Sequence, residues 1–130
     1  MLPRRVLLIA PQWPVRPLVK AELEHRGFDV LGADSIRLAL DLCMKAGFKP
    51  GVVVVDSSGL SLDALDTARL RFLRGRSPLL LIRSSWRDEA VIEALSPDRE
   101  LPRPVTVGQI ADAVAEMAGR ERQSPSGPEC

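Results

Sequence analysis

The 130-residue chain has no tyrosine, a single histidine and only 4% aromatic residues. Its two cysteines, Cys43 and Cys130, lie too far apart for a disulfide framework or a metal-site spacing, so a reducing cytoplasm is the expected location. The net charge of +1 gives no electrostatic reason to expect nucleic acid or an anionic membrane as a partner. The longest apolar run near the start, residues 6–10, is far shorter than the roughly 20 residues of a membrane span.

Catalytic motifs are also missing from the sequence. There is no glycine-rich phosphate loop, and no serine or cysteine is matched with a histidine and an acid in a recognisable spacing. We therefore expect no catalytic residues and no enzymatic activity.

Three short runs of valine, leucine and isoleucine are present, at residues 6–10, 52–55 and 79–82. Unbroken apolar runs of this length are typical of strands buried on both faces of a parallel sheet. Two weaker strands are predicted at 28–31 and 101–105, the second at an edge because its prolines cannot donate to a ladder. Strong strands in the centre and weak ones outside predict an α/β fold with the flavodoxin-like strand order 2-1-3-4-5 and helices on both faces of the sheet.

Segments with helical periodicity separate the predicted strands. Ser35 and the Thr106–Gln109 capping-box pattern mark two helix starts. A short helix is expected around Val91 and Leu95, and a longer one has an apolar stripe formed by Leu62, Leu65, Ala68 and Phe72. The polar segment 120–130 is expected to be a disordered tail or the start of a linker, which leaves residues 1–119 as the folded domain.

The order of these features resembles a known family. Asp56 closes the third strand, Ser-Pro-Leu-Leu-Leu-Ile at 77–82 opens the fourth, and Leu-Pro-Arg-Pro at 101–104 precedes the last helix. Together they resemble a response-regulator receiver domain over residues 4–119. The resemblance implies that Asp56 corresponds to the phosphoacceptor, and that an acidic pair after the first strand helps it to hold a divalent metal. It also implies a Thr or Ser after the fourth strand and a Lys before a cis-proline after the fifth.

The sequence departs from the family at most of these positions. The acidic-pair positions are Ala10 and Pro11, the Thr/Ser position is Arg83 with Ser84 after it, and the Lys position is Arg103, followed by Pro104. The switch aromatic of the family falls near Glu100.

These departures lead to three expectations about the site. Mg²⁺ needs hard oxygen ligands, so one carboxylate among arginines is not expected to bind it, and no cofactor is predicted. Asp56 is either a former phosphoacceptor or simply the polar residue that ends a strand. Its predicted partner is Arg83, with Arg103 as the other candidate. Separately, the resemblance implies that Arg103–Pro104 is a cis peptide.

The function that follows is an atypical receiver, a signalling domain that binds a protein partner or a second copy without phosphorylation. The resemblance places the partner face on the fourth helix, fifth strand and fifth helix, here including Trp86, Glu100 and Leu101. One alternative is a receiver that accepts phosphate from a histidine kinase at Asp56. Another is an anion-sensing module at Arg83 and Arg103.

Overall fold

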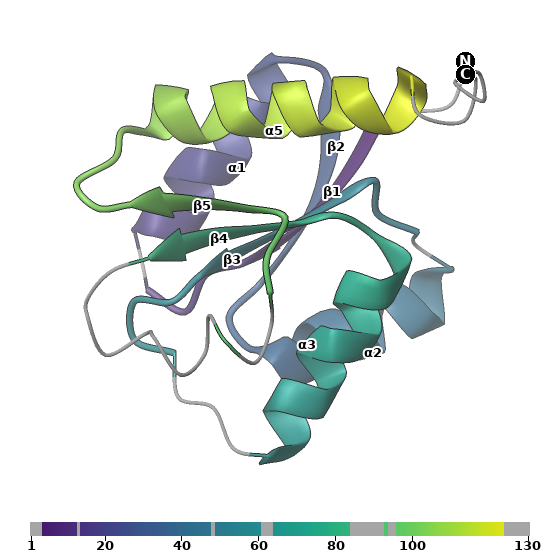
Figure 1. The fold of residues 1–130 in the computed structure, drawn as a ribbon. Coiled ribbons are helices and arrows are strands. Elements are labelled where there is room, and N and C mark those ends of the chain that lie inside the picture. Colours follow the sequence, from purple (N-terminus) through teal and green to yellow (C-terminus); the bar gives the residue numbers. More distant parts are fainter. Residues whose placement is uncertain are drawn as a thin grey trace.

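The computed structural model describes residues 4–12, 14–47, 49–60, 64–83, 93 and 96–123. Within them, five strands form one sheet: β1 (Arg4–Ile9), β2 (Phe28–Ala33), β3 (Val52–Asp56), β4 (Leu79–Arg83) and β5 (Arg99–Pro102). Every neighbouring pair is parallel, and the spatial order is β2-β1-β3-β4-β5. The predicted fold class and strand order are confirmed (Figure 1).

Helices cover both faces of this sheet (Figure 1). The described helices are α1 (Val15–His25), α2 (Ile36–Ala46), α3 (Ala64–Arg76) and α5 (Val107–Gln123). The pair α1 and α5 packs on one face, and α2 and α3 pack on the other. The short helix expected around Val91 and Leu95 lies outside the described residues. Among the described helices, none combines the length and the apolar character needed to cross a bilayer.

Two helix starts have the caps that the sequence predicts. Ser35 caps α2, because its Oγ accepts a hydrogen bond from the backbone N–H of Leu38 at 3.1 Å. At the start of α5, the N–H of Gln109 donates to Thr106 Oγ1 at 3.0 Å, and the N–H of Thr106 donates to Gln109 Oε1 at 2.9 Å. This reciprocal pair satisfies two backbone donors that a helix end leaves without partners.

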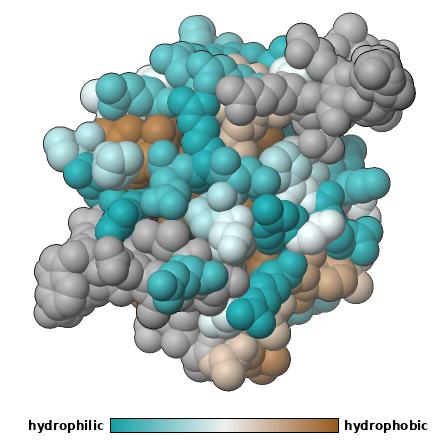
Figure 2. Space-filling model, in the orientation of Figure 1, coloured by the Kyte–Doolittle hydropathy of each residue, from teal (hydrophilic) through white to brown (hydrophobic). Residues whose placement is uncertain are grey.

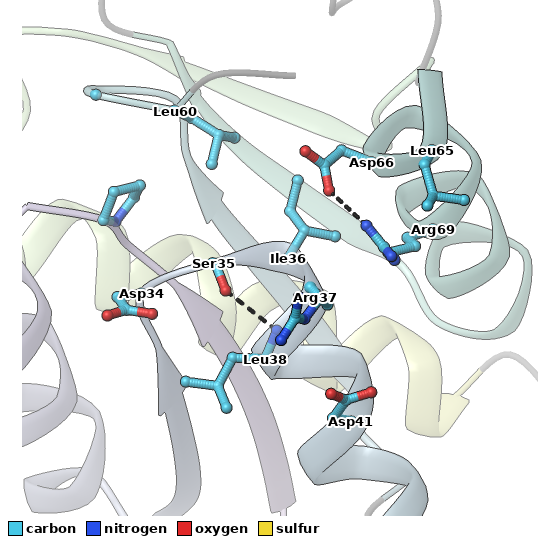
Figure 3. Close-up of a pocket in the computed structure, with 12 residues that line it drawn as sticks. Asp34, Ser35, Ile36, Arg37, Leu38, Asp41, Leu60, Leu65, Asp66 and Arg69 are labelled. Carbon is cyan, nitrogen blue, oxygen red and sulfur yellow. Dashed lines mark hydrogen bonds and ion pairs between the residues drawn. The ribbon is translucent and has the colours of Figure 1, made fainter. Parts of the chain in front are cut away.

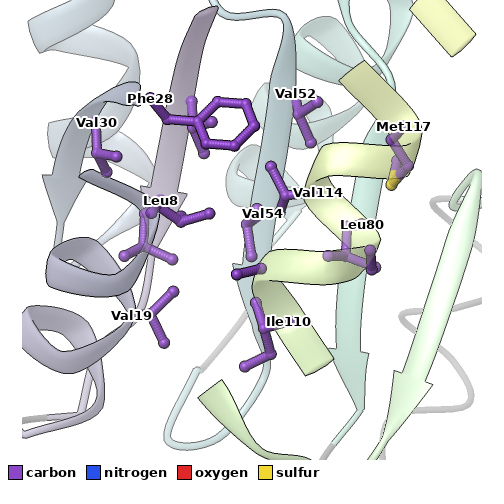
Figure 4. Packing of buried hydrophobic residues seen from close by; sticks show 14 of the residues in the cluster. Leu8, Val19, Phe28, Val30, Val52, Val54, Leu80, Ile110, Val114 and Met117 are labelled. Atoms are coloured by element: carbon purple, nitrogen blue, oxygen red, sulfur yellow. The ribbon is translucent and has the colours of Figure 1, made fainter. Parts of the chain in front are cut away.

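The core consists of two layers because side chains alternate along each buried strand. The layer under α1 and α5 receives one set of strand residues: Val6, Leu8, Val52, Val54, Leu80 and Ile82 (Figure 4). The layer under α2 and α3 receives the alternate set: Leu7, Ile9, Val53, Val55, Leu79 and Leu81. The parity of a strand residue therefore decides which face of the sheet it occupies.

Two predicted boundaries are corrected by the structure. The last strand was expected at 101–105, but β5 runs from Arg99 to Pro102. It ends there because Pro104 has no N–H to donate, and the final ladder bond is from Arg103 N–H to the Arg83 carbonyl at 2.9 Å. Its position at the sheet edge is as predicted. Helix α5 continues to Gln123, four residues past the expected domain end at 119.

The predicted buried face of α3 is also wrong. Leu65, Ala68 and Phe72 are exposed, Leu62 lies outside the described residues, and the residues that pack onto the sheet are Leu70 and Leu73. The helix carries apolar side chains on two sides, and both sets have helical spacing, so periodicity alone does not choose between them. The unburied set leaves large apolar side chains on the surface of α3.

Candidate functional site at the carboxyl edge of the sheet

Asp56 is the last residue of β3, and its side chain is only 1% exposed. Both carboxylate oxygens have hydrogen-bond donors. The backbone N–H of Ser58 donates to Oδ1 at 3.0 Å, and the guanidinium of Arg103 donates from Nη2 to Oδ2. A buried carboxylate is tolerated when a counter-charge and hydrogen bonds replace its hydration, and Asp56 has both.

The Ser58 contact comes from a local turn. An Asp side chain that accepts from the N–H two residues later forms an Asx-turn, and Asp-Ser-Ser-Gly is a sequence suited to it. Gly59 follows with a φ of +75°, a region that glycine adopts at little cost. The Ser58 donor was not predicted from the sequence, although the Asp-to-Gly spacing would have indicated it.

Arg103 is the ion-pair partner of Asp56. It follows β5, and the Arg103–Pro104 peptide is cis, as predicted. The Arg103 side chain is 27% exposed, so the pair is buried at the carboxylate and reaches solvent only at the arginine. The Arg103 Nε is buried and has no hydrogen-bond partner in the described structure. The guanidinium is held instead through Nη2, which donates to Asp56 Oδ2.

The predicted pairing of Arg83 with Asp56 is wrong. Arg83 Nη1 lies 3.9 Å from Glu100 Oε1 instead. The cause is strand parity: Asp56 has the parity of Val54 and is in register with Ile82, so Arg83 falls on the opposite face. Arg103 lies two residues after Leu101, which is in register with Ile82, and it therefore shares the face of Asp56.

Ala10 and Pro11 occupy the positions where the resemblance implies an acidic pair. Ala10 is completely buried in the α1–α5 layer, and its carbonyl oxygen accepts from Arg16 Nη1 at 2.8 Å. Pro11 lines a hollow of about 590 Å³ between the starts of α2 and α3 (Figure 3). At the end of β1, where the resemblance implies two carboxylates, the chain thus has an apolar side chain, a proline and the guanidinium of Arg16.

This donor set does not fit Mg²⁺. The ion prefers one or two carboxylates with waters in an octahedral arrangement. Asp56 is the only carboxylate among the family's metal positions, it is buried, and Arg103 already holds one of its oxygens. In the described part of the chain, no group of three His, Cys, Asp or Glu side chains is placed to hold a metal ion.

The remaining candidate residues divide into two groups. Ser84 and Trp86 lie outside the described residues. Glu100 is exposed and Leu101 is half-buried, both on β5. A hollow of about 450 Å³ lies between β5 and the first turns of α5, and apolar side chains line it: Leu101, Pro102, Pro104 and Val105.

Ion pairs surround that hollow. Arg99 pairs with Glu116 of α5, and Arg26 donates to Asp112 at 2.5 Å and to Glu22 at 3.0 Å. The hydrogen bond to Asp112, followed by that to Glu22, raises the pKa of Arg26. The hollow is therefore lined both by apolar side chains and by charged ones that are paired within the chain.

No protein-family model and no curated protein sequence matches the chain. Solved structures do match. A response regulator receiver domain protein from Clostridium thermocellum superposes with a TM-score of 0.73 at 21% identity, over 92% of this chain and 97% of that one. The chain has the receiver fold.

Two further structures have the same fold. A chemotaxis response regulator of Vibrio cholerae matches with a TM-score of 0.70 at 18% identity, over 89% of this chain and 99% of that one. A protein described as an adenylate cyclase from Rhodopirellula baltica matches with a TM-score of 0.77 at 22% identity, over 98% and 96%. At these identities the likeness establishes the receiver fold alone, so function must be argued from the residues of this chain.

Proposed function

We propose that this receiver-fold chain is a signalling domain that binds a protein partner without being phosphorylated. The observation that supports the proposal is the state of Asp56. Its carboxylate is buried, and its two oxygens are held by Arg103 and by the Ser58 N–H. The residues that would hold a metal beside it are replaced by Ala10 and Pro11.

Phosphoryl transfer to Asp56 would have to overcome two obstacles. The attacking oxygen must leave the Arg103 guanidinium or the Ser58 N–H, and it must approach a phosphoryl donor from a site that is only 1% exposed. The charge that develops on the phosphoryl oxygens is normally stabilised by a metal and by positioned cations. The Arg103 guanidinium is already paired with the Asp56 carboxylate, and Arg16 donates to the Ala10 carbonyl, so neither is free to supply that stabilisation.

The Asp56–Arg103 pair also has a positive role in this proposal. It connects the end of β3 to the segment after β5, and that segment leads directly into α5. Because this segment also lines the hollow between β5 and α5, the pair holds the partner face in one conformation. The occupant of this face is proposed to be a protein partner or a second copy of the chain.

The anion-sensing alternative has less support. Arg83 lies near the Glu100 carboxylate, and Arg103 is paired with Asp56. An anion would have to displace a carboxylate from each arginine. The phosphorylatable receiver is the alternative that an experiment should separate from the proposal.

The test is incubation with acetyl phosphate and Mg²⁺, followed by phosphate-affinity electrophoresis. The expected result is a single unshifted band for the wild-type chain and for Asp56→Asn. A triple variant, Ala10→Asp, Pro11→Asp and Arg103→Lys, restores the acidic pair and the lysine that the resemblance implies and provides the matched control. A shifted wild-type band that disappears in Asp56→Asn would establish the phosphorylatable receiver instead.

A further inference from the structure

Large apolar side chains are exposed mainly on one surface of the molecule. Among the described residues, five large hydrophobic side chains are exposed, and four of them lie on α2 and α3: Leu38, Met44, Leu65 and Phe72. The fifth, Leu18, lies on α1. Figure 2 shows tan and brown surface at the lower right, where Figure 1 places these two helices. Single exposed leucines are ordinary, but a group on one helix pair indicates an interaction surface.

Met44 and Phe72 line a hollow of about 410 Å³ between the last turns of α2 and α3, here called the α2–α3 hollow. Cys43, Leu73 and Pro50 are among its other lining residues. Ser77 Oγ donates to the Pro50 carbonyl at 2.7 Å and fixes one side of the hollow to the start of β3. An exposed phenylalanine can anchor a partner side chain, and an exposed methionine adapts its shape to it.

The charged residues of the α2–α3 hollow have one sign. Lys49 and Arg76 line it, and no acidic side chain does so in the described part of the chain. The Arg76 guanidinium lies 5.3 Å from the centre of the Phe72 ring, so cation and aromatic surface are adjacent. The hollow at the other end of the same helices is different, because it includes both signs: Asp34, Arg37, Asp41, Asp66 and Arg69 (Figure 3).

We infer that the α2–α3 hollow docks a segment of a partner protein in which large apolar residues stand beside acidic ones. The apolar residues would contact Met44 and Phe72, and the acidic residues would face Lys49 and Arg76. Complementary charge of this kind selects the partner and sets its orientation.

Two other occupants fit the hollow less well. A two-fold contact between copies of this chain would place each basic rim against itself, since a symmetric interface uses the same patch twice. The segment 124–130 that follows α5 contains no large aliphatic or aromatic residue to fill the hollow. An acidic, apolar segment of another protein satisfies both the shape and the charge.

The inference does not depend on the chemistry of Asp56. The α2–α3 hollow adjoins Pro50 and Ser77, which precede β3 and β4, whereas Asp56 ends β3 at the opposite edge of the sheet. Phosphate-affinity electrophoresis tests the proposed function, and peptide binding at the α2–α3 hollow tests this inference separately.

The test is selection of short random peptides displayed on phage against the immobilised full chain. An enriched peptide is then synthesised with a fluorophore and titrated by fluorescence anisotropy. We expect enriched peptides to combine large apolar with acidic residues. Binding should weaken by about tenfold or more in Phe72→Gln and in the double variant Lys49→Glu, Arg76→Glu. Leu18→Gln is the matched control, because it removes an exposed leucine elsewhere, and it should bind as the wild type does.

Several results would overturn the inference. They are the absence of enriched peptides, enrichment of basic peptides, or equal binding by wild type and Phe72→Gln. Concentration-dependent dimers that disappear in Phe72→Gln would make a second copy the occupant. Binding to phosphatidylglycerol vesicles that is lost in Lys49→Glu, Arg76→Glu would make it a lipid surface. Circular dichroism of each variant checks that it is folded, so that a loss of binding can be assigned to the altered surface.

Discussion

Asp56 differs from an ordinary strand-ending aspartate because its charge is kept in a buried position. Bringing a carboxylate out of water costs several kcal/mol unless hydrogen bonds and a counter-charge compensate. Arg103 supplies the counter-charge from the neighbouring loop, and Ser58 supplies a backbone donor. In this structure the counter-charge of Asp56 is therefore a guanidinium.

We predict that the chain does not bind Mg²⁺ saturably at millimolar concentration. The double variant Ala10→Asp, Pro11→Asp should show weak binding, because it adds two carboxylates beside Asp56 while Arg103 still competes for it. Isothermal titration calorimetry measures Mg²⁺ binding by the wild-type chain and by the double variant.

The matched control is Ala10→Asn, Pro11→Asn, which has similar shape without charge and should not bind. Since Ala10 is fully buried, circular dichroism must first show that each variant is folded. Saturable heat in the wild type that is lost in Asp56→Asn would contradict the prediction.

The strands decide which residues meet at the site. Arg83 and Asp56 end neighbouring strands, which makes them look like partners in the sequence. Their register, Asp56 opposite Ile82, places Arg83 on the other face. Register between strands follows from packing of the whole sheet, so the sequence alone did not reveal it. Two candidates for the partner of Asp56 were available from the sequence, and parity selects Arg103.

Helix α5 begins at a reciprocal cap that we expect to contribute measurably to stability. Thr106→Ala removes the Oγ1 acceptor of the Gln109 N–H, and the free energy of unfolding should fall by about 1 kcal/mol. Urea denaturation followed by circular dichroism measures the change. Thr106→Ser keeps the hydroxyl acceptor and should remain close to wild type. Equal stability of Thr106→Ala and wild type would mean that the cap contributes nothing in solution.

The architecture of the whole molecule was largely predictable. The unbroken apolar runs 52–55 and 79–82 are typical of central strands in a parallel sheet, and the two weaker strands were therefore predicted at the outside of the sheet. The buried face of α3 was not predictable, because apolar residues occupy two of its sides. The differences at Ala10, Pro11 and Arg103 from what the resemblance implies were visible in the sequence, but the ion pair between Arg103 and Asp56 required the structure.

We expect that Arg103 neutralises buried Asp56 and thereby holds the site in one conformation. A double-mutant cycle tests it through the free energy of unfolding of Asp56→Asn, Arg103→Gln and the double variant. Arg103→Gln alone leaves a buried carboxylate without its counter-charge and should cost on the order of 3 kcal/mol. Arg83→Gln is the control, because Arg83 lies on the opposite face of the sheet from Asp56, and its effect should be additive with that of Asp56→Asn.

We expect the double variant to be more stable than Arg103→Gln alone, because the asparagine side chain introduced by Asp56→Asn carries no charge into the buried site. The two substitutions would then be strongly coupled. Additive effects of Asp56→Asn and Arg103→Gln, or a coupling of Asp56→Asn to Arg83→Gln as strong as its coupling to Arg103→Gln, would contradict this expectation.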